Sequence, residues 1–173
     1  MRLFHISEES DIKIFEPRTP TRTDLDKSVR LVWAINETCL PNYLTPRNCP
    51  RVTYHVGKNT SMSDRLKFFS SPTQTHAVII ERKWYQTMQS TTLYVYEFDP
   101  TDFFLQDEIA GYYVAKTAQK PKAKYVVNDL FRELVSRNIE IRIVDNLWNL
   151  ADEVMQSTLD WSFCKMAFAQ PRL

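Results

Sequence analysis

The chain has 173 residues, of which 43% are hydrophobic and 25% are charged, and its formal net charge is +1 at pH 7. A chain of this length and composition can bury a sizeable core, so we expect a single globular domain over residues 1–173. The near-zero net charge argues against a dedicated binder of nucleic acids or membrane surfaces, since such proteins usually carry a large basic excess.

The small numbers of cysteines and glycines further limit the kinds of binding site that the chain can form. Cys39, Cys49 and Cys164 are an odd number at wide spacing, which matches neither a disulfide framework nor a zinc motif. Gly57 and Gly111 are the only glycines, whereas loops that cradle phosphates need several. A Walker-type loop and a dinucleotide-binding fingerprint are therefore excluded, and no metal is expected.

The first residues and the apolar runs of the sequence indicate where the protein is expected to be located. The first residues lack the basic stretch, apolar run and cleavage site of a signal peptide. No apolar run approaches the ~20 residues that a membrane span needs. We expect a cytoplasmic protein with reduced thiols and no membrane partner.

The first half of the chain predicts short strands separated by polar turns. Strands are expected over residues 3–6, 29–35 and 51–56, because apolar residues run together or alternate there. About two helical turns are expected over 38–44, where proline is tolerated only near the start. A helix is expected over 61–69, with Leu66 and Phe69 turned inward.

The second half predicts further strands and two amphipathic helices. Strands are expected over 77–81, 92–98, 103–105, 112–115, 124–127, 139–144 and 159–168, and a helical turn over 83–88. The helices are expected over 128–137, with an apolar face of Leu130, Phe131, Leu134 and Val135, and over 147–155. Strands with inserted helices indicate an α+β fold with a split, twisted, mixed or antiparallel sheet and peripheral helices.

Two side chains have both a structural and a functional interpretation. Alternation puts His5 on the same face of its strand as Leu3, so it is either a hydrogen-bonded strand histidine or a ligand for a ribose hydroxyl. Tyr43 is either a core aromatic or a flat wall for a planar ring.

Other candidates carry weaker signals. His55 and His76 lack the spacing of metal ligands, and Cys39 is better explained as a small buried side chain than as a nucleophile. Four lysines lie among tyrosines at 116, 120, 122 and 124. They are either phosphate contacts or the lysines of a protected strand edge.

Five stretches resemble an uncharacterised family of bacterial proteins, a domain of unknown function, and the likeness covers the whole chain. These stretches are residues 3–9 (LFHISEE), 32–37 (VWAINE), 40–44 (LPNYL), 49–52 (CPRV) and 111–114 (GYYV). The resemblance implies a family but no activity.

Residues 3–5 also resemble the opening motif of the ADP-ribosyltransferase fold, shared by toxins, poly-ADP-ribose polymerases and tRNA 2′-phosphotransferases. In those families a strand histidine binds the adenosine ribose of NAD, and a tyrosine after a strand and a small helix packs on nicotinamide. The resemblance implies that His5 is the ribose ligand, that Tyr43 is the nicotinamide wall and that Ser7 lines the same cleft. Ile6 stands where those families usually have glycine.

The third motif of that fold is often a glutamate that orients the nucleophile. Residues 111–116 contain no acid, so the resemblance leaves Glu108, Glu97 and Glu81 as catalytic candidates. The phosphotransferases use basic residues instead, and Arg18, Arg47 or Arg51 could stabilise phosphate charge in that way.

The leading hypothesis is therefore NAD-dependent transfer of ADP-ribose, or related chemistry on an ADP-ribose-like group, with His5, Ser7, Tyr43, Arg47 and Arg51 binding the cofactor. The alternative is a non-catalytic module that binds a small nucleotide-like ligand or a protein on the same fold. Nucleic-acid contact through the lysines is a third hypothesis, which predicts binding that weakens steeply with salt.

Overall fold

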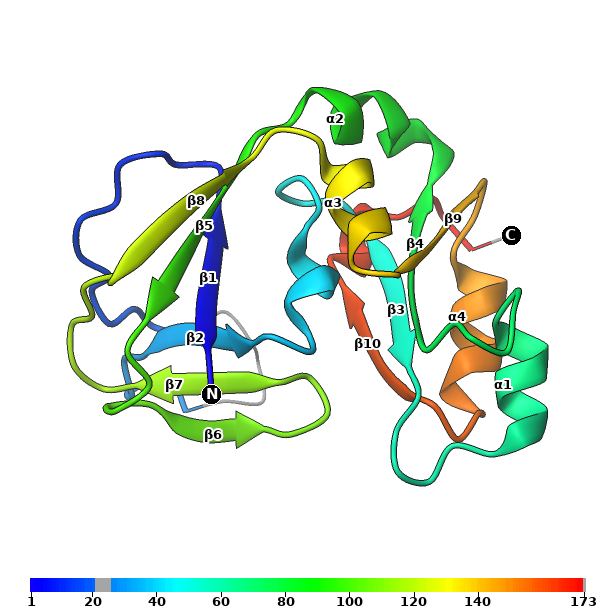
Figure 1. Cartoon of the computed structure of the whole chain (residues 1–173), viewed down its shortest axis with the longest axis horizontal. Helices are drawn as coiled ribbons and strands as arrows, with labels where there is room; N and C mark the ends of the chain where they lie inside the picture. Colours follow the sequence, from blue (N-terminus) through cyan, green and yellow to red (C-terminus); the bar gives the residue numbers. More distant parts are fainter. Residues whose placement is uncertain (21–25, 173) are drawn as a thin grey trace. The chain divides into compact units, whose positions relative to one another are not determined.

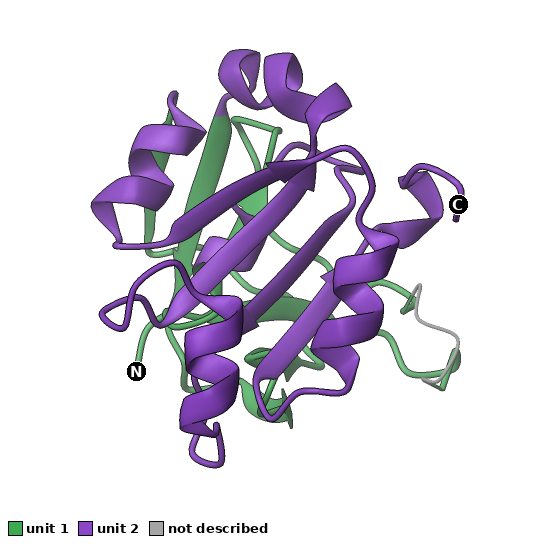
Figure 2. Ribbon diagram, turned by 90° about the vertical axis from the view of Figure 1, so that its right-hand side faces the viewer, with its two compact units in different colours: residues 1–40, 93–127 green, residues 41–92, 128–173 purple. Residues whose placement is uncertain are grey.

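The computed structural model describes residues 1–20 and 26–172, and its helices and strands are labelled in Figure 1. The chain forms two compact units, each assembled from two segments that are distant in the sequence (Figure 2). Unit 1 comprises Met1–Leu40 and Leu93–Val127, and unit 2 comprises Pro41–Thr92 and Asn128–Leu173. Each unit has its own sheet and its own hydrophobic cluster.

Unit 1 is built on a six-stranded antiparallel sheet with the strand order β6-β7-β2-β1-β5-β8. Its strands are β1 (Leu3–Ser7), β2 (Val32–Asn36), β5 (Leu93–Phe98), β6 (Phe104–Asp107), β7 (Tyr112–Ala115) and β8 (Ala123–Val127). Because β1 pairs on both sides, with β2 and with β5, the face to which each of its side chains points is fixed.

Phe15 is a central member of the hydrophobic cluster of unit 1. Its ring meets Tyr96 and Phe98 edge-on, at centroid distances of 5.2 and 5.0 Å. Its main chain exchanges hydrogen bonds of 2.9 and 3.0 Å with Gln119. Other buried members of the cluster are Leu3, Val32, Ala34, Phe103 and Ala115. The segment that follows β1 is thus held over one face of the sheet.

Unit 2 is built on a four-stranded sheet with the order β10-β3-β4-β9. Its strands are β3 (Arg51–His55), β4 (His76–Glu81), β9 (Glu140–Val144) and β10 (Asp160–Cys164). Only β4 and β9 pair in parallel, and such a pair needs a long crossover connection. Helical elements lie before, between and after these strands: η1 (Leu40–Tyr43), α1 (Met62–Phe68), η2 (Arg82–Trp84), α2 (Tyr85–Ser90), α3 (Leu130–Ser136), α4 (Trp148–Met155) and η3 (Met166–Phe168).

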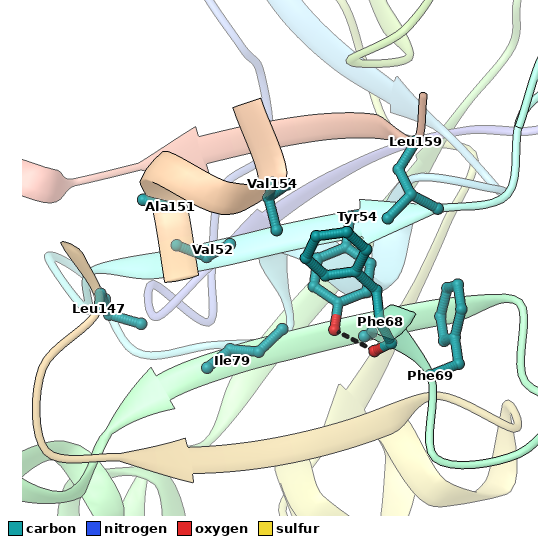
Figure 3. Close-up of a cluster of buried hydrophobic side chains, with 10 residues drawn as sticks. Val52, Tyr54, Phe68, Phe69, Ile79, Leu147, Ala151, Val154 and Leu159 are labelled. Carbon is teal, nitrogen blue, oxygen red and sulfur yellow. Dashed lines mark hydrogen bonds between the residues drawn. The ribbon is translucent and has the colours of Figure 1, made fainter. Parts of the chain in front are cut away.

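The hydrophobic cluster of unit 2 lies between its sheet, α1 and α4 (Figure 3). Val52 and Tyr54 contribute from β3, as alternation in that strand requires. The Tyr54 hydroxyl donates a 2.7 Å hydrogen bond to the Phe68 carbonyl, which ties β3 to the end of α1. The cluster also contains Phe69, Ala77, Ile79, Leu147, Ala151, Val154 and Leu159.

The structure confirms the α+β class, with one antiparallel and one mixed sheet, but corrects three sequence predictions. Leu66 and Val135, expected to face inward, are each 65% exposed, whereas Phe68 is buried. The strand expected over 159–168 ends at Cys164, because Lys165 adopts a left-handed conformation with φ 57° and starts η3. Among the described residues, no helix combines the length and apolar character needed to cross a membrane.

Candidate functional site

His5 lies in β1 on the same face as Leu3, as its strand position predicts, and is partly buried. Its Nδ1 lies 3.0 Å from the carbonyl oxygen of Trp33, and its ring packs on Phe15 at a centroid distance of 4.7 Å. A carbonyl can only accept, so this contact assigns the proton to Nδ1 and leaves Nε2 as an acceptor.

The surroundings of His5 keep its imidazole neutral. Burial lowers the pKa of His5, and the hydrogen bond to Trp33 opposes that shift only in part. The charge of Arg18 lowers the pKa further and that of Glu9 raises it, so both side chains are near enough to act on the ring. The protein thus presents a neutral ring of fixed tautomer within the electrostatic influence of Arg18.

Ser7 and Arg18 complete this region of unit 1. The Ser7 hydroxyl accepts a 3.0 Å hydrogen bond from the main-chain N–H of Glu9, which shapes the turn after β1. Arg18 is anchored by two main-chain hydrogen bonds with Leu31, of 2.9 and 3.0 Å, while its side chain is exposed. An acceptor nitrogen, a hydroxyl and a guanidinium are the groups that recognise a ribose with an attached phosphate.

Glu97 does not lie beside His5. In the β1–β5 ladder Glu97 is opposite Phe4 and Tyr96 is opposite His5, so Glu97 and His5 point to opposite faces of the sheet. The Glu97 carboxylate binds Arg2 at 2.8 Å, Lys122 at 3.2 Å and the Tyr125 hydroxyl at 2.9 Å. Its hydrogen bonds with Arg2, the strongest influence, hold the pKa of Glu97 at about 2.

The other two candidate acids occupy different surroundings. Glu81 is fully buried in unit 2, where its carboxylate accepts from the Gln170 N–H at 2.8 and 3.1 Å and pairs with Lys83 at 3.2 Å. Glu108 is exposed in unit 1, in the turn that its carbonyl closes by accepting a 3.3 Å hydrogen bond from Gly111. Neither geometry assigns a catalytic role.

Tyr43 and Arg51 lie together in unit 2. The Arg51 guanidinium is 5.1 Å from the centroid of the Tyr43 ring, and the Tyr43 hydroxyl is 3.9 Å from the Cys164 sulfur. Arg51 is buried and donates to the carbonyls of Asn42 and Cys49, at 2.6 and 3.0 Å. It therefore braces the loop around η1.

Arg47 is exposed in the loop between η1 and β3. Like Tyr43 and Arg51 it belongs to unit 2, whereas His5 and Ser7 belong to unit 1. A shared site for these residues stays a prediction from the sequence.

The remaining candidates are placed as follows. Cys39 is 2% exposed, with its sulfur 3.6 Å from the carbonyl of Ile109. Lys116 directly follows β7, while the lysines at 120, 122 and 124 precede or belong to β8, an edge strand of the same sheet. Lys122 pairs with Glu97 at 3.2 Å, and Lys124 donates to the carbonyl of Ser10 at 2.6 Å. The Lys116 ammonium lies 5.9 Å from the centroid of the Phe104 ring, so the fold uses three of these lysines in contacts of its own.

Spacing in the sequence gave no reason to group His55 and His76, yet they are directly opposite each other in the β3–β4 ladder. Their ring centroids are 5.3 Å apart, and Asp160 of β10 lies 3.7 Å from the His55 Nε2. The His76 Nε2 donates to Asn42 at 2.6 Å, and burial lowers the pKa of His76 to about 3. We call His55, His76 and Asp160 the histidine row. Only the register of the strands could have shown that these residues lie together.

The contacts of the histidine row are a hydrogen bond and a charge contact rather than the arrangement of a metal site. Within residues 1–20 and 26–172, no group of three or more His, Cys, Asp or Glu side chains is arranged to hold a metal ion. Burial also lowers the pKa of His55, and Asp160 opposes that shift. Both imidazoles of the row are thus held neutral.

Comparison with known proteins gives a family but no activity. No curated protein and no solved structure matches the chain. One family model covers nearly all of it, from the first strand of unit 1 to the segment after β10 in unit 2, over residues 4–169. On that match the chain belongs to the family of unknown function DUF6886.

Proposed function

We propose that the chain binds NAD, or a ligand with an ADP-ribose-like group, through His5 and transfers the ADP-ribosyl group to an acceptor. The observation that carries the proposal is the state of the His5 ring: its Nδ1 is engaged by the Trp33 carbonyl and its pKa is lowered by burial. Its Nε2 is then a fixed acceptor for a ribose hydroxyl at neutral pH.

The charges near His5 support the same class of ligand. Arg18 acts on the ring electrostatically and carries an exposed side chain, so it can pair with a phosphate next to the bound ribose. The likeness of residues 3–5 to the opening motif of the ADP-ribosyltransferase fold points to the adenosine ribose of NAD as that group.

The transfer itself is a substitution at the nicotinamide ribose. The acceptor nucleophile forms a bond to C1′ and gives up its proton to water, while the C1′–N bond breaks and its electron pair neutralises the departing nicotinamide ring. For the other groups of the site the expectation from the sequence remains Tyr43 as the nicotinamide wall, Ser7 in the lining of the cleft, and Arg47 or Arg51 as stabilisers of phosphate charge.

A second candidate function is a non-catalytic ligand-binding module. It is favoured by the surroundings of two candidate acids, since Glu97 is paired with Arg2 and Lys122, and Glu81 is buried against Gln170. Carboxylates held in this way are poorly placed to orient a nucleophile. This candidate predicts binding of NAD or ADP-ribose without release of nicotinamide.

The binding test uses two substitutions of His5 that distinguish the role of its Nδ1 from the role of its Nε2. In His5→Asn the short amide can still donate to the Trp33 carbonyl but cannot reach the position of Nε2, whereas in His5→Gln the longer amide can. Calorimetry should show binding of NAD to the wild type and about tenfold weaker binding to His5→Asn, the loss expected for one hydrogen bond. His5→Gln should retain more affinity than His5→Asn.

Release of nicotinamide distinguishes the two candidate functions, and the binding measurements can contradict both of them. Release of nicotinamide from NAD by the wild type, followed by chromatography, supports transfer, and binding without release supports the module. If neither NAD nor ADP-ribose binds to the wild type, or if both variants bind as the wild type does, His5 is not the ligand residue.

A further inference from the structure

The parallel strands β4 and β9 end together at one edge of the unit 2 sheet. In their ladder Ile80 is opposite Ile143 and Glu81 is opposite Val144, and both strands end at the second of these pairs. From there β4 continues into η2 and α2, while β9 continues into the turn before α4 (Figure 1). Chains that leave adjacent parallel strands in different directions open a crevice outside the strand ends, and α/β sheets bind ligands in such crevices.

A hollow lies at this edge of unit 2, and we call it the strand-end pocket. Its volume is about 550 Å³, within the range of about 300–1,000 Å³ that is usual for small-molecule sites. It is lined by residues from β9 and from the segment directly after β4: Ile143, Arg82, Lys83, Tyr85 and Gln86. All of them belong to unit 2, whereas His5 belongs to unit 1.

Arg82 is the main cation of the strand-end pocket. Its Nε donates a 2.8 Å hydrogen bond to the Asp145 carboxylate, whereas its Nη groups make no hydrogen bond with the described residues. The Arg82 and Asp145 side chains are 72% and 80% exposed, so their ion pair is weak and a bound anion can compete with it. The described residues that line the pocket include a second cation, Lys83, and no acid.

Lys83 and Gln86 supply further donors. The Lys83 ammonium binds the Phe168 carbonyl at 3.0 Å and the Glu81 carboxylate at 3.2 Å, which fixes its position and leaves one of its three N–H groups for a ligand. The Gln86 side chain is exposed, and its amide makes no hydrogen bond within the described part of the chain. Donors that line one hollow favour a phosphate or carboxylate group, whose oxygens accept several hydrogen bonds.

Two exposed apolar side chains accompany these donors. Tyr85 and Ile143 are 40% and 38% exposed, and both line the strand-end pocket. The Tyr85 ring contacts Phe131 of α3 at a centroid distance of 5.3 Å, which holds the ring in place. A fixed aromatic ring next to cationic groups favours a ligand whose anionic group is attached to a flat apolar body.

We infer that the strand-end pocket binds a small molecule in which a phosphate or carboxylate group is joined to a planar ring. The anionic group pairs with Arg82 and accepts hydrogen bonds from Lys83 and Gln86. The ring of the ligand lies against Tyr85 and Ile143. The inference goes beyond the proposed function, because this ligand needs no ribose and its site contains no residue of unit 1.

The binding test uses phenyl phosphate and benzoate, which join a ring to each of the two anionic groups. Each is titrated into the isotope-labelled full chain, and NMR follows the backbone amides. Saturable shifts are expected at residues 82–86 and 143–145, and the tighter of the two probes shows which anionic group the site prefers. The preferred probe should bind more tightly than phenol, which lacks the charge, and than inorganic phosphate or acetate, which lack the ring.

Three substitutions at exposed positions test the charge of the strand-end pocket. Arg82→Gln should weaken binding of the preferred probe about tenfold, the loss expected for one charged hydrogen bond. Gln86→Glu should also weaken it, because the new carboxylate repels the anion and pairs with Arg82 four positions earlier. Gln86→Lys should strengthen it. Exposed substitutions of this kind should leave the fold intact, as far-UV circular dichroism would verify.

Lys67→Gln is the matched control for Arg82→Gln. Lys67 lies in α1 and forms an exposed ion pair with Glu153, at 2.9 Å, so its substitution removes the same charge and a comparable pair. Binding of the preferred probe should be unchanged in this variant. An equal loss in Lys67→Gln and Arg82→Gln would overturn the inference, since affinity would then follow overall charge.

Two further results would overturn the inference. One is the absence of saturable shifts at residues 82–86 and 143–145 with both phenyl phosphate and benzoate. The other is binding of inorganic phosphate or acetate as tight as that of the matching ring compound, because the ring would then contribute nothing. Neither result bears on the binding of NAD by His5, since the probes lack a ribose and the observed amides lie in unit 2.

Discussion

Gly111→Ala should destabilise unit 1 by about 2–5 kcal/mol. Gly111 has φ +69°, and the left-handed region costs a residue with a Cβ about 1–2 kcal/mol. A Cβ there would also lie 2.6 Å from Asn36 Oδ1 and 2.8 Å from the Cβ and sulfur of Cys39. Overpacking of this kind adds about 1–3 kcal/mol.

The atoms around Gly111 have little room to move. Asn36 Oδ1 accepts a 2.9 Å hydrogen bond from the Cys39 N–H, and the Asn36 N–H donates to the Gly111 carbonyl at 2.9 Å. A shift of Asn36 away from the new methyl group would therefore disturb both bonds at the end of β2. The steric cost cannot be relieved by rotating one side chain.

Gly57→Ala is the matched control, since the three atoms nearest to its Cβ would all belong to the carboxylate group of Asp160, at 2.2–2.8 Å. That side chain is 36% exposed and can swing away, so a loss of less than about 1 kcal/mol is expected. Urea unfolding of both variants, followed by fluorescence and circular dichroism, gives the two free energies. Losses that agree within about 0.5 kcal/mol would refute the reasoning, because backbone strain and a rigid neighbour would then not matter.

Three further predictions concern single side chains. Glu97→Gln should cost about 1–2 kcal/mol at pH 7 through lost charged hydrogen bonds. Because the folded-state pKa of Glu97 is lowered from 4.5 to about 2, the difference from the wild type in urea midpoint should be complete above pH 4.5 and vanish as the pH falls to 2. Tyr54→Phe should cost about 1 kcal/mol in urea unfolding, since it removes the 2.7 Å bond to Phe68. Phe68→Ala should cost about 3–5 kcal/mol in the same assay, but Leu66→Ala less than about 0.5 kcal/mol, because Leu66 is 65% exposed.

Elements with a strong local pattern could be predicted from the sequence. β4 is buried at every position, as its continuous apolar run indicates, and Val52 and Tyr54 of β3 share one buried face, as alternation indicates. The short α1 was harder, because Leu66, Phe68 and Phe69 all fall within one helical turn of its end. The packing of Tyr54 against Phe68 and Phe69, which is a tertiary contact, decides which of them is buried.

The candidate site could be predicted only as far as strand alternation reaches. Alternation assigns His5 to the face of Leu3, but the hydrogen bond that fixes its tautomer depends on the β1–β2 pairing, which brings Trp33 within 3.0 Å. The same limit applies to His55 and His76, whose contact follows from the β3–β4 register. Register between strands joined by long loops is set by the whole core, and no local spacing encodes it.

The candidate acids show why the sequence could not decide between catalysis and binding. Glu97 and Glu81 look alike as single carboxylates in apolar strands, yet each is paired with a group about half the chain away: Arg2, 95 positions distant, and the Gln170 N–H, 89 positions distant. Because these partners already bind the two carboxylates, neither carboxylate is free to interact with a substrate as a catalytic acid would. Since Arg2 lies just before β1 and Gln170 lies after η3, the chemistry of each acid depends on a segment that the local pattern describes only as a strand end or a loop.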